Sequence, residues 1–252
     1  MSGPLLEVAG LTVRHGGLVA LRDVDLSVEP GTIAGLIGPN GAGKTTLIDT
    51  LSGFTRARVG RITFRGERVE ELAPHERARR GLVRTFQSLE LFDDLTVREN
   101  LLVAEATPTL RSTVTDLFRR KDQRSPGAEE LLEALDLLDW ADRRPTELSN
   151  GQRHLVALAR AVVAKPQLLL LDEPAAGLDT AETAELSAIL RRLPELGTSV
   201  LMVDHDMALV MGICEVINVL DFGTVIATGT PAQVRADPRV VAAYLGSEGR
   251  AS

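Results

Sequence analysis

The chain has 252 residues, of which 44% are hydrophobic, and its 28 Lys and Arg against 35 Asp and Glu give a formal net charge of −7. This length allows one large α/β domain or a core with a small insertion, and the acidic balance argues against a dominant nucleic-acid surface, because phosphate neutralisation needs a basic face. The single cysteine, Cys214, excludes an intrachain disulfide and a cysteine-based zinc cluster.

The chain lacks the sequence patterns of membrane insertion and export. No run approaches the roughly 18 consecutive apolar residues of a spanning helix, and the first residues lack the basic and apolar stretches of a signal peptide. We therefore expect a chain that is not exported and whose membrane role, if any, is peripheral.

The first predicted elements are two strands that form a hairpin. Residues 5–13 and 18–28 alternate apolar and polar side chains around a break at His15-Gly16-Gly17, which predicts a hairpin with one buried face. A third strand is predicted over the apolar run 32–37.

A glycine-rich loop follows that strand and precedes helix-like residues 47–51. It reads Gly38-Pro39-Asn40-Gly41-Ala42-Gly43-Lys44-Thr45-Thr46. Its glycines let backbone N–H groups turn inward, and the next helix adds the positive end of its dipole. Lys44 can then reach the β- and γ-phosphates of a nucleotide, and the Thr45 hydroxyl can bind Mg²⁺. A glycine-rich turn without function is the alternative, which the preceding strand and the following helix disfavour.

Two short strands and a helix are predicted after this phosphate loop. Residues 60–66 read as a strand between glycines, and 73–80 as a short charged helix. Together with the first hairpin, the strand predicts a small antiparallel sheet beside the nucleotide. Residues 82–87 read as a buried strand that ends on Gln87, where chemistry is expected.

The pattern becomes helical from residue 96 to about 148, where apolar residues recur at helical spacing. We predict an inserted helical subdomain over 88–150. Within it, residues 111–127 contain few core residues and a charge run, which indicates an exposed connection or a weak helix. Its charges are either solvated or part of a partner contact.

The remaining chain alternates helices and strands. Helices are predicted over 151–164, 180–192 and 206–211, and strands over 167–171, 199–203 and 216–220. This alternation predicts a parallel sheet with helices on both faces.

Three polar side chains follow two of these strands. Asp172 and Glu173 come after the apolar run 168–171, and His205 comes after 200–203. Taken alone, the carboxylates could be solvated ends of a core strand, and the histidine could be structural. Beside a phosphate loop, Asp172 can hold the Mg²⁺ shell, Glu173 can polarise a water for attack, and His205 can bind the γ-phosphate.

Residues 148–152, Leu-Ser-Asn-Gly-Gln, open a helix, with Ser149 or Asn150 as its N-cap and Gly151 permitting close backbone approach. The phosphate loop, Gln87, this signature, Leu-Asp-Glu and His205 occur in the order found in ATP-binding cassette (ABC) ATPases, which the chain resembles over residues 5–248. The resemblance implies an α/β P-loop NTPase cassette with a mainly parallel core and an antiparallel β subdomain from 1–87 and 151–248. Asn150 replaces a glycine of the family's signature.

The resemblance also implies roles for single residues. Two cassettes would close head to tail around Mg·ATP, with Ser149, Gly151 and Gln152 of one binding the γ-phosphate held by the other. Glu173, His205 and Gln87 would be catalytic, Thr45, Gln87 and Asp172 would serve the metal, and residues 176–179 would form the D-loop at the contact between the two cassettes. His15 stands where the family stacks an aromatic on adenine, and it either stacks or has only a turn role.

Five segments outside the nucleotide motifs resemble the larger ATP-binding subunit of bacterial branched-chain amino acid importers: 84–87, 111–127, 172–178, 205–211 and 242–246. This implies an ATPase at the cytoplasmic face of the bacterial inner membrane that energises uptake of branched-chain or related small amino acids and amides. Its partners would be a second ATPase subunit, integral membrane permeases and, indirectly, a periplasmic or lipid-anchored binding protein, with no nucleic acid.

Two alternatives stay open. The lipopolysaccharide-export ATPase shares part of the tail, so another transporter is one of them. A soluble ABC ATPase of DNA repair or translation is the other, although the sequence has no coiled-coil insertion, zinc-binding cysteines or second cassette.

Overall fold

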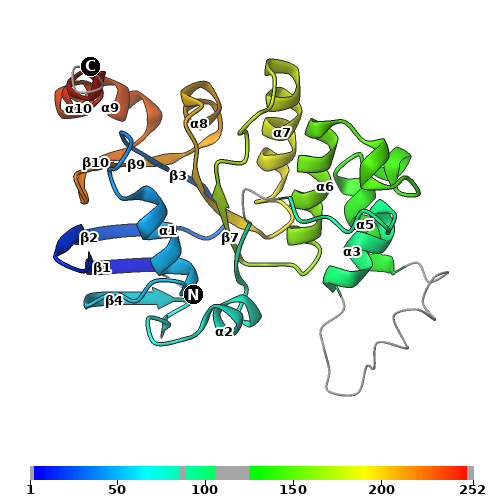
Figure 1. Ribbon diagram of the computed structural model, residues 1–252, viewed down its shortest axis with the longest axis horizontal. Coiled ribbons are helices and arrows are strands. Elements are labelled where there is room, and N and C mark those ends of the chain that lie inside the picture. The colour runs from blue at the N-terminus through cyan, green and yellow to red at the C-terminus, as the bar shows by residue number, and fades with distance from the viewer. Residues whose placement is uncertain (1–2, 86–88, 106–124, 249–252) are drawn as a thin grey trace.

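The computed structural model describes residues 3–85, 89–105 and 125–248. These residues form two sheets and a group of helices at one end of the molecule (Figure 1). The smaller sheet has the order β2-β1-β4-β5, and the larger one β10-β9-β3-β8-β7-β6.

The smaller sheet is antiparallel, as the sequence predicts. It contains β1 (Leu6–His15), β2 (Leu18–Val28), β4 (Val59–Phe64) and β5 (Glu67–Arg68). Side chains alternate between buried and exposed along the first half of β1, because only one face of this sheet meets the core. His15 pairs with Leu18 at the end of the hairpin.

The larger sheet is mainly parallel. It contains β3 (Ile33–Ile37), β6 (Leu82–Arg84), β7 (Leu168–Asp172), β8 (Ser199–Val203), β9 (Val216–Asp221) and β10 (Thr224–Gly229), and only β10 runs antiparallel to its neighbour. Every residue of β3, β7 and β8 is buried, as expected for central strands covered on both faces.

The two faces of the larger sheet belong to separate cores. Leu168 and Leu170 of β7 join a core with the small sheet and α1 (Lys44–Ser52). Leu169 and Leu171 point the other way, into a core with α6 (Asn150–Val162), α7 (Thr180–Arg192) and α8 (Met207–Ile213). Helices α1 and α6 therefore lie on opposite faces of the sheet.

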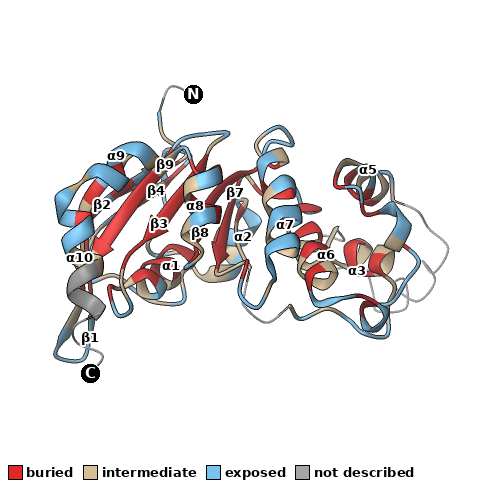
Figure 2. Ribbon diagram, turned by 90° about the horizontal axis from the view of Figure 1, so that it is seen from above, coloured by how far each residue is buried: buried red, intermediate tan, exposed pale blue. Residues whose placement is uncertain are grey.

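The helical part lies beyond α6 and α7, at the opposite end of the molecule from the small sheet (Figure 2). It contains α3 (Val97–Glu105), α5 (Pro126–Ala134) and two short 3₁₀ helices, η1 (Leu138–Trp140) and η2 (Pro145–Glu147). Most of the predicted connection 111–127 lies outside the described residues, but its last two residues begin α5. Proline suits this first turn because its missing N–H has no partner there.

Several short elements have no counterpart in the sequence prediction. They are β5, β10, α9 (Pro231–Ala236) and α10 (Pro238–Glu248); α2 (Pro74–Arg79), by contrast, falls in the predicted helix 73–80. Helices α9 and α10 pack on each other and on β10 (Figure 1). Within the described ranges, no helix has the length and apolar character that crossing a membrane requires.

Candidate functional site

The phosphate loop joins β3 to α1 and needs glycine at two crowded positions. Gly38 has φ 155° and Gly43 has φ 105°. A Cβ on Gly38 would lie 2.0 Å from the carbonyl oxygen of Leu220, and one on Gly43 would lie 2.9 Å from that of Ala20. The loop therefore packs closely between the end of β9 and the start of β2.

Lys44, the first residue of α1, is a buried cation held by this loop. Its Nζ donates to the carbonyl oxygens of Gly38 at 2.7 Å and Pro39 at 3.0 Å, and the residue is 7% exposed. Burial lowers the pKa of Lys44, and the negative charges of Glu173 and Asp172 partly offset this effect. A buried ammonium beside a helix N-terminus and a glycine-rich turn fits an anionic group such as a nucleotide phosphate.

The two predicted carboxylates lie at the same sheet edge as the phosphate loop, because β3, β8 and β7 are parallel neighbours. Asp172 is the last residue of β7, one residue later than the predicted strand end, and its Oδ2 lies 2.9 Å from Nη2 of Arg84. Glu173 has a left-handed backbone, with φ 52°, and its N–H donates to the carbonyl of Val203 at 2.7 Å.

His205 lies beside Glu173. Its Nε2 is 2.9 Å from Oε1 of Glu173, so the histidine and the predicted catalytic base form one polar pair. Both remain partly accessible, with 51% of the His205 side chain and 28% of the Glu173 side chain exposed. This pair can bind a phosphate oxygen or a water molecule at the open edge of the sheet.

The predicted metal ligands suit a hard cation whose remaining ligands are oxygens of water and phosphate. Thr45 is exposed at the start of α1, and Asp172 ends β7. Among the described residues, no group of three or more His, Cys, Asp or Glu could hold a metal on its own. A set of one hydroxyl and one carboxylate is typical of Mg²⁺, which keeps waters and takes substrate phosphates as further ligands. Gln87, the third predicted ligand, lies outside the described residues.

Sequence reasoning missed Asp204, which organises the segment around Glu173 and His205. This residue is 6% exposed, and burial raises its pKa. Its Oδ2 accepts the N–H of Ala175 at 3.0 Å, and its Oδ1 accepts that of Asp206 at 2.8 Å. The sequence did contain a signal for Asp204, because this acidic residue comes directly after the apolar strand that ends at Val203.

The signature caps α6 and is tied to the D-loop of the same chain. Ser149 is the N-cap: its Oγ accepts the N–H of Gln152 at 3.2 Å, and its own N–H donates to the Gln152 side chain at 2.9 Å. Asn150 donates instead to the carbonyl of Gly177 at 3.2 Å. Gly151 N–H donates to Glu182 of α7 at 2.9 Å, where a Cβ would lie 2.6 Å from that side chain.

The signature and the phosphate loop begin helices that belong to different cores. The signature begins α6 and the phosphate loop begins α1, and these helices cover opposite faces of the larger sheet.

His15 lies at the exposed end of the β1–β2 hairpin. The hairpin adjoins the phosphate loop, since Arg22 N–H donates to Gly223 O and Gly223 N–H donates to Ala42 O, at 2.8 and 2.9 Å. These bonds connect the hairpin that carries His15 to the phosphate loop, and stacking of His15 on a base stays a prediction.

Comparisons with known proteins extend over nearly the whole chain. The sequence matches the family model described as ABC transporter over residues 21–176 and the model described as branched-chain amino acid ATP-binding cassette transporter over residues 224–250. It is 43% identical to the high-affinity branched-chain amino acid transport ATP-binding protein BraF of Pseudomonas aeruginosa, with 98% of this chain and 99% of BraF covered. Identity to LivG of Escherichia coli K12, a protein of the same description, is 44% with the same coverage.

The fold is similar to a solved ATP-binding cassette. The crystal structure of the ADP conformation of MJ1267, an ATP-binding cassette of an ABC transporter, superposes with a TM-score of 0.84 at 31% identity, covering 97% of this chain and 100% of that one.

Proposed function

The chain belongs to the ABC transporter family, and we propose that it is the ATP-hydrolysing subunit that energises an importer of branched-chain amino acids or related small amino acids and amides. The observation that carries the ATPase assignment is the gathering of Lys44, Asp172, Glu173 and His205 at the sheet edge that bears the phosphate loop. The cargo assignment rests on the near-full-length similarity to BraF and LivG and on the match at residues 224–250.

Each residue at this edge has a separate task in the proposed reaction. Lys44 supplies the positive charge for the β- and γ-phosphates, and Thr45 and Asp172 would hold Mg²⁺, which would neutralise phosphate charge. Glu173 takes the proton of the attacking water. His205, whose Nε2 lies 2.9 Å from Glu173, orients that carboxylate before the nucleotide binds and donates to the γ-phosphate once ATP is in place.

A second ATPase subunit completes the site in this proposal. As the family resemblance implies, Ser149, Gly151 and Gln152 bind the γ-phosphate of the opposing subunit; they begin α6, which covers the opposite face of the larger sheet from α1. The bond from Asn150 to Gly177 keeps the signature and the D-loop, residues 176–179, together as one contact surface. The side-chain amide of Asn150 thereby has a role that the family's glycine lacks.

Coupling to transport is proposed through the helical subdomain, residues 88–150, and Gln87. These would contact integral membrane permease subunits at the cytoplasmic face of the bacterial inner membrane, and a periplasmic or lipid-anchored binding protein would act indirectly. Co-purification of permeases with a tagged chain from detergent-solubilised membranes tests this partner. Recovery of the chain alone would favour a soluble ABC ATPase.

The Glu173→Gln variant tests the catalytic assignment. We expect it to bind ATP as well as the unaltered chain and to stop turnover, because the amide keeps the shape of the side chain but cannot take a proton. ATP should then trap a dimer on gel filtration. Glu185→Gln, an exposed change of the same type on α7, is the matched control and should hydrolyse ATP normally. Near-normal hydrolysis by a monomeric Glu173→Gln protein would refute the role.

The cargo is tested by uptake in cells whose only copy of this subunit carries Lys44→Ala. We expect uptake of labelled leucine, isoleucine and valine to be lost. Retained uptake of all three would contradict the cargo assignment.

A further inference from the structure

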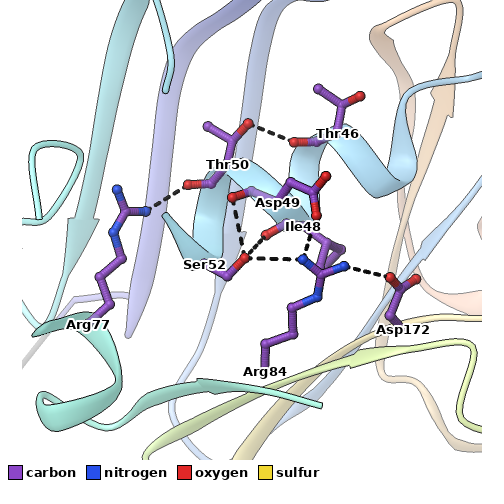
Figure 3. Close-up of polar contacts among 8 residues, drawn as sticks. All are labelled: Thr46, Ile48, Asp49, Thr50, Ser52, Arg77, Arg84 and Asp172. Carbon is purple, nitrogen blue, oxygen red and sulfur yellow. Dashed lines mark hydrogen bonds and ion pairs between the residues drawn. The ribbon is translucent and has the colours of Figure 1, made fainter. Parts of the chain in front are cut away.

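Arg84 is a nearly buried arginine that joins two parts of the nucleotide site. It ends β6, three residues before Gln87, and 9% of its side chain is exposed. Its Nη1 lies 2.5 Å from Oδ1 of Asp49, and its Nη2 lies 2.9 Å from Oδ2 of Asp172 (Figure 3). One guanidinium thus bridges two carboxylates.

The two carboxylates come from the two elements that carry the proposed magnesium ligands. Asp49 lies on α1, four residues after Thr45 and therefore on the same side of that helix. Asp172 ends β7. The Arg84 bridge therefore connects the helix of one proposed ligand to the strand of the other.

A planar guanidinium suits this connection. Its two Nη groups diverge at a fixed angle, so they can hold two carboxylates in a defined relation, whereas the single ammonium of lysine cannot. Asp49 balances the charge of Arg84, so that Asp172 receives a directional bond without an uncompensated positive charge beside it. Nη1 also lies 3.4 Å from Ser52 Oγ, and Cζ lies 5.9 Å from the Phe54 ring, which further restrict the guanidinium.

We propose that Arg84 is a positioning residue for the metal site: it holds Oδ2 of Asp172, leaves Oδ1 for the hydration shell of the cation, and fixes β7 relative to α1. This inference rests on the proposed role of Asp172. It adds a residue that touches neither nucleotide nor metal but orients a ligand of the metal. Buried ion pairs are weak contributors to stability, which gives little reason to place one here for stability alone.

Manganese binding provides a readout that is independent of hydrolysis. The isolated full-length chain is saturated with the β,γ-imido analogue of ATP, and free Mn²⁺ is counted by electron paramagnetic resonance. We expect Arg84→Gln to weaken Mn²⁺ binding about 10-fold, the lower end of the loss seen when the partner of a metal ligand is removed. Binding of the analogue in EDTA should stay unchanged, because the phosphate loop is untouched.

The direction of this effect separates positioning from charge. Removing a positive charge near the metal should by itself tighten Mn²⁺ binding, so weaker binding requires loss of orientation. Arg79→Gln is the control: it removes the same positive charge from an exposed position on α2, and it should bind Mn²⁺ normally. Arg84→Lys keeps the charge but cannot bridge both carboxylates, and it should also bind Mn²⁺ more weakly. That variant decides the question if Arg84→Gln does not fold.

Two results would overturn the inference: unchanged Mn²⁺ affinity in a folded Arg84→Gln or Arg84→Lys protein, or a loss of analogue binding in EDTA as large as the loss of Mn²⁺ binding. The first would make Arg84 a purely structural residue, and the second would locate the defect in the phosphate loop. Asp172→Asn distinguishes the premise from the inference. If that variant also bound Mn²⁺ normally, the proposed role of Asp172 would fail as well.

Discussion

Replacing Arg77 by methionine should destabilise the chain through the end of the phosphate-loop helix. Arg77 lies on α2 and is 2% exposed. Its Nη1 donates to the carbonyls of Thr50 and Leu51, both at 2.7 Å, in the last turn of α1. Carbonyls at the end of a helix lack the N–H groups of a following turn and form the negative end of its dipole, so a cation there stabilises them. Figure 3 draws the bond from Arg77 to Thr50, whose carbonyl also accepts the N–H of Gly53 at 3.3 Å.

The magnitude follows from the bonds that are lost. Nη2 and Nε donate to the carbonyls of Glu70 and Leu72 at 2.9 and 3.0 Å, so one side chain satisfies four carbonyl oxygens. Methionine fills a similar volume but offers no donor, and each buried acceptor left unsatisfied costs about 1 kcal/mol or more. Because the Thr50 carbonyl keeps the N–H of Gly53, the other three carbonyls set the cost, and we expect a loss of about 3 kcal/mol in the free energy of unfolding. For a chain of this size, that lowers Tm by roughly 6 to 12 °C.

Urea unfolding of the nucleotide-free chain measures this loss. Arg79→Met, on an exposed position of the same helix, is the matched control and should stay within about 0.5 kcal/mol of the unaltered chain. A loss below about 1 kcal/mol in Arg77→Met would refute the reasoning, because it would mean that these carbonyls find other partners.

Three further predictions concern Lys44 and His15, two residues of the proposed nucleotide site. Lys44→Met should lose most ATP affinity in calorimetry, because the phosphate-directed charge is gone; undiminished affinity would contradict the phosphate-loop assignment. Burial lowers the pKa of Lys44 in the folded chain. Between that lowered pKa and the ordinary value of about 10.4, the unfolded chain therefore binds more protons than the folded chain, so the free energy of unfolding should rise with pH. This rise should be smaller in Lys44→Met. His15→Tyr should tighten binding of fluorescent ATP if His15 stacks on adenine, by less than the roughly 1–3 kcal/mol of a full aromatic stack. Equal dissociation constants for the unaltered chain, His15→Tyr and His15→Ala would leave the hairpin residue with a turn role only.

The fold was predictable where hydrophobic patterns are long and regular. Helix α7 and strand β8 begin and end at the predicted residues, because a capped amphipathic stretch and a short apolar run each have one stable arrangement. Helix α9 was not predicted, since its 6 residues are too few to show a helical period. Its start was nevertheless marked by Thr230, which caps it.

The site was predictable as far as its motifs extend. Lys44 and Glu173 lie in sequence motifs that by themselves indicate their chemistry. The partners of Arg84 and Arg77 are distant in sequence, so the sequence alone does not distinguish these two arginines from arginines on the solvent-exposed surface. The N-cap of α6 was open for a related reason: serine and asparagine both cap well, and only the folded geometry selects Ser149.

The strand order of the larger sheet also has a consequence for synthesis. Strand β3, which leads into the phosphate loop, pairs only with β8 and β9, whose residues begin at Ser199 of a chain of 252. The β1–β2 hairpin has its partner nearby and can form early on the ribosome, whereas β3 has no neighbour until most of the chain has been translated. For most of its synthesis the nascent chain therefore carries an apolar strand without its neighbours, and we expect a product that stops before Ser199 to leave β3 unpaired.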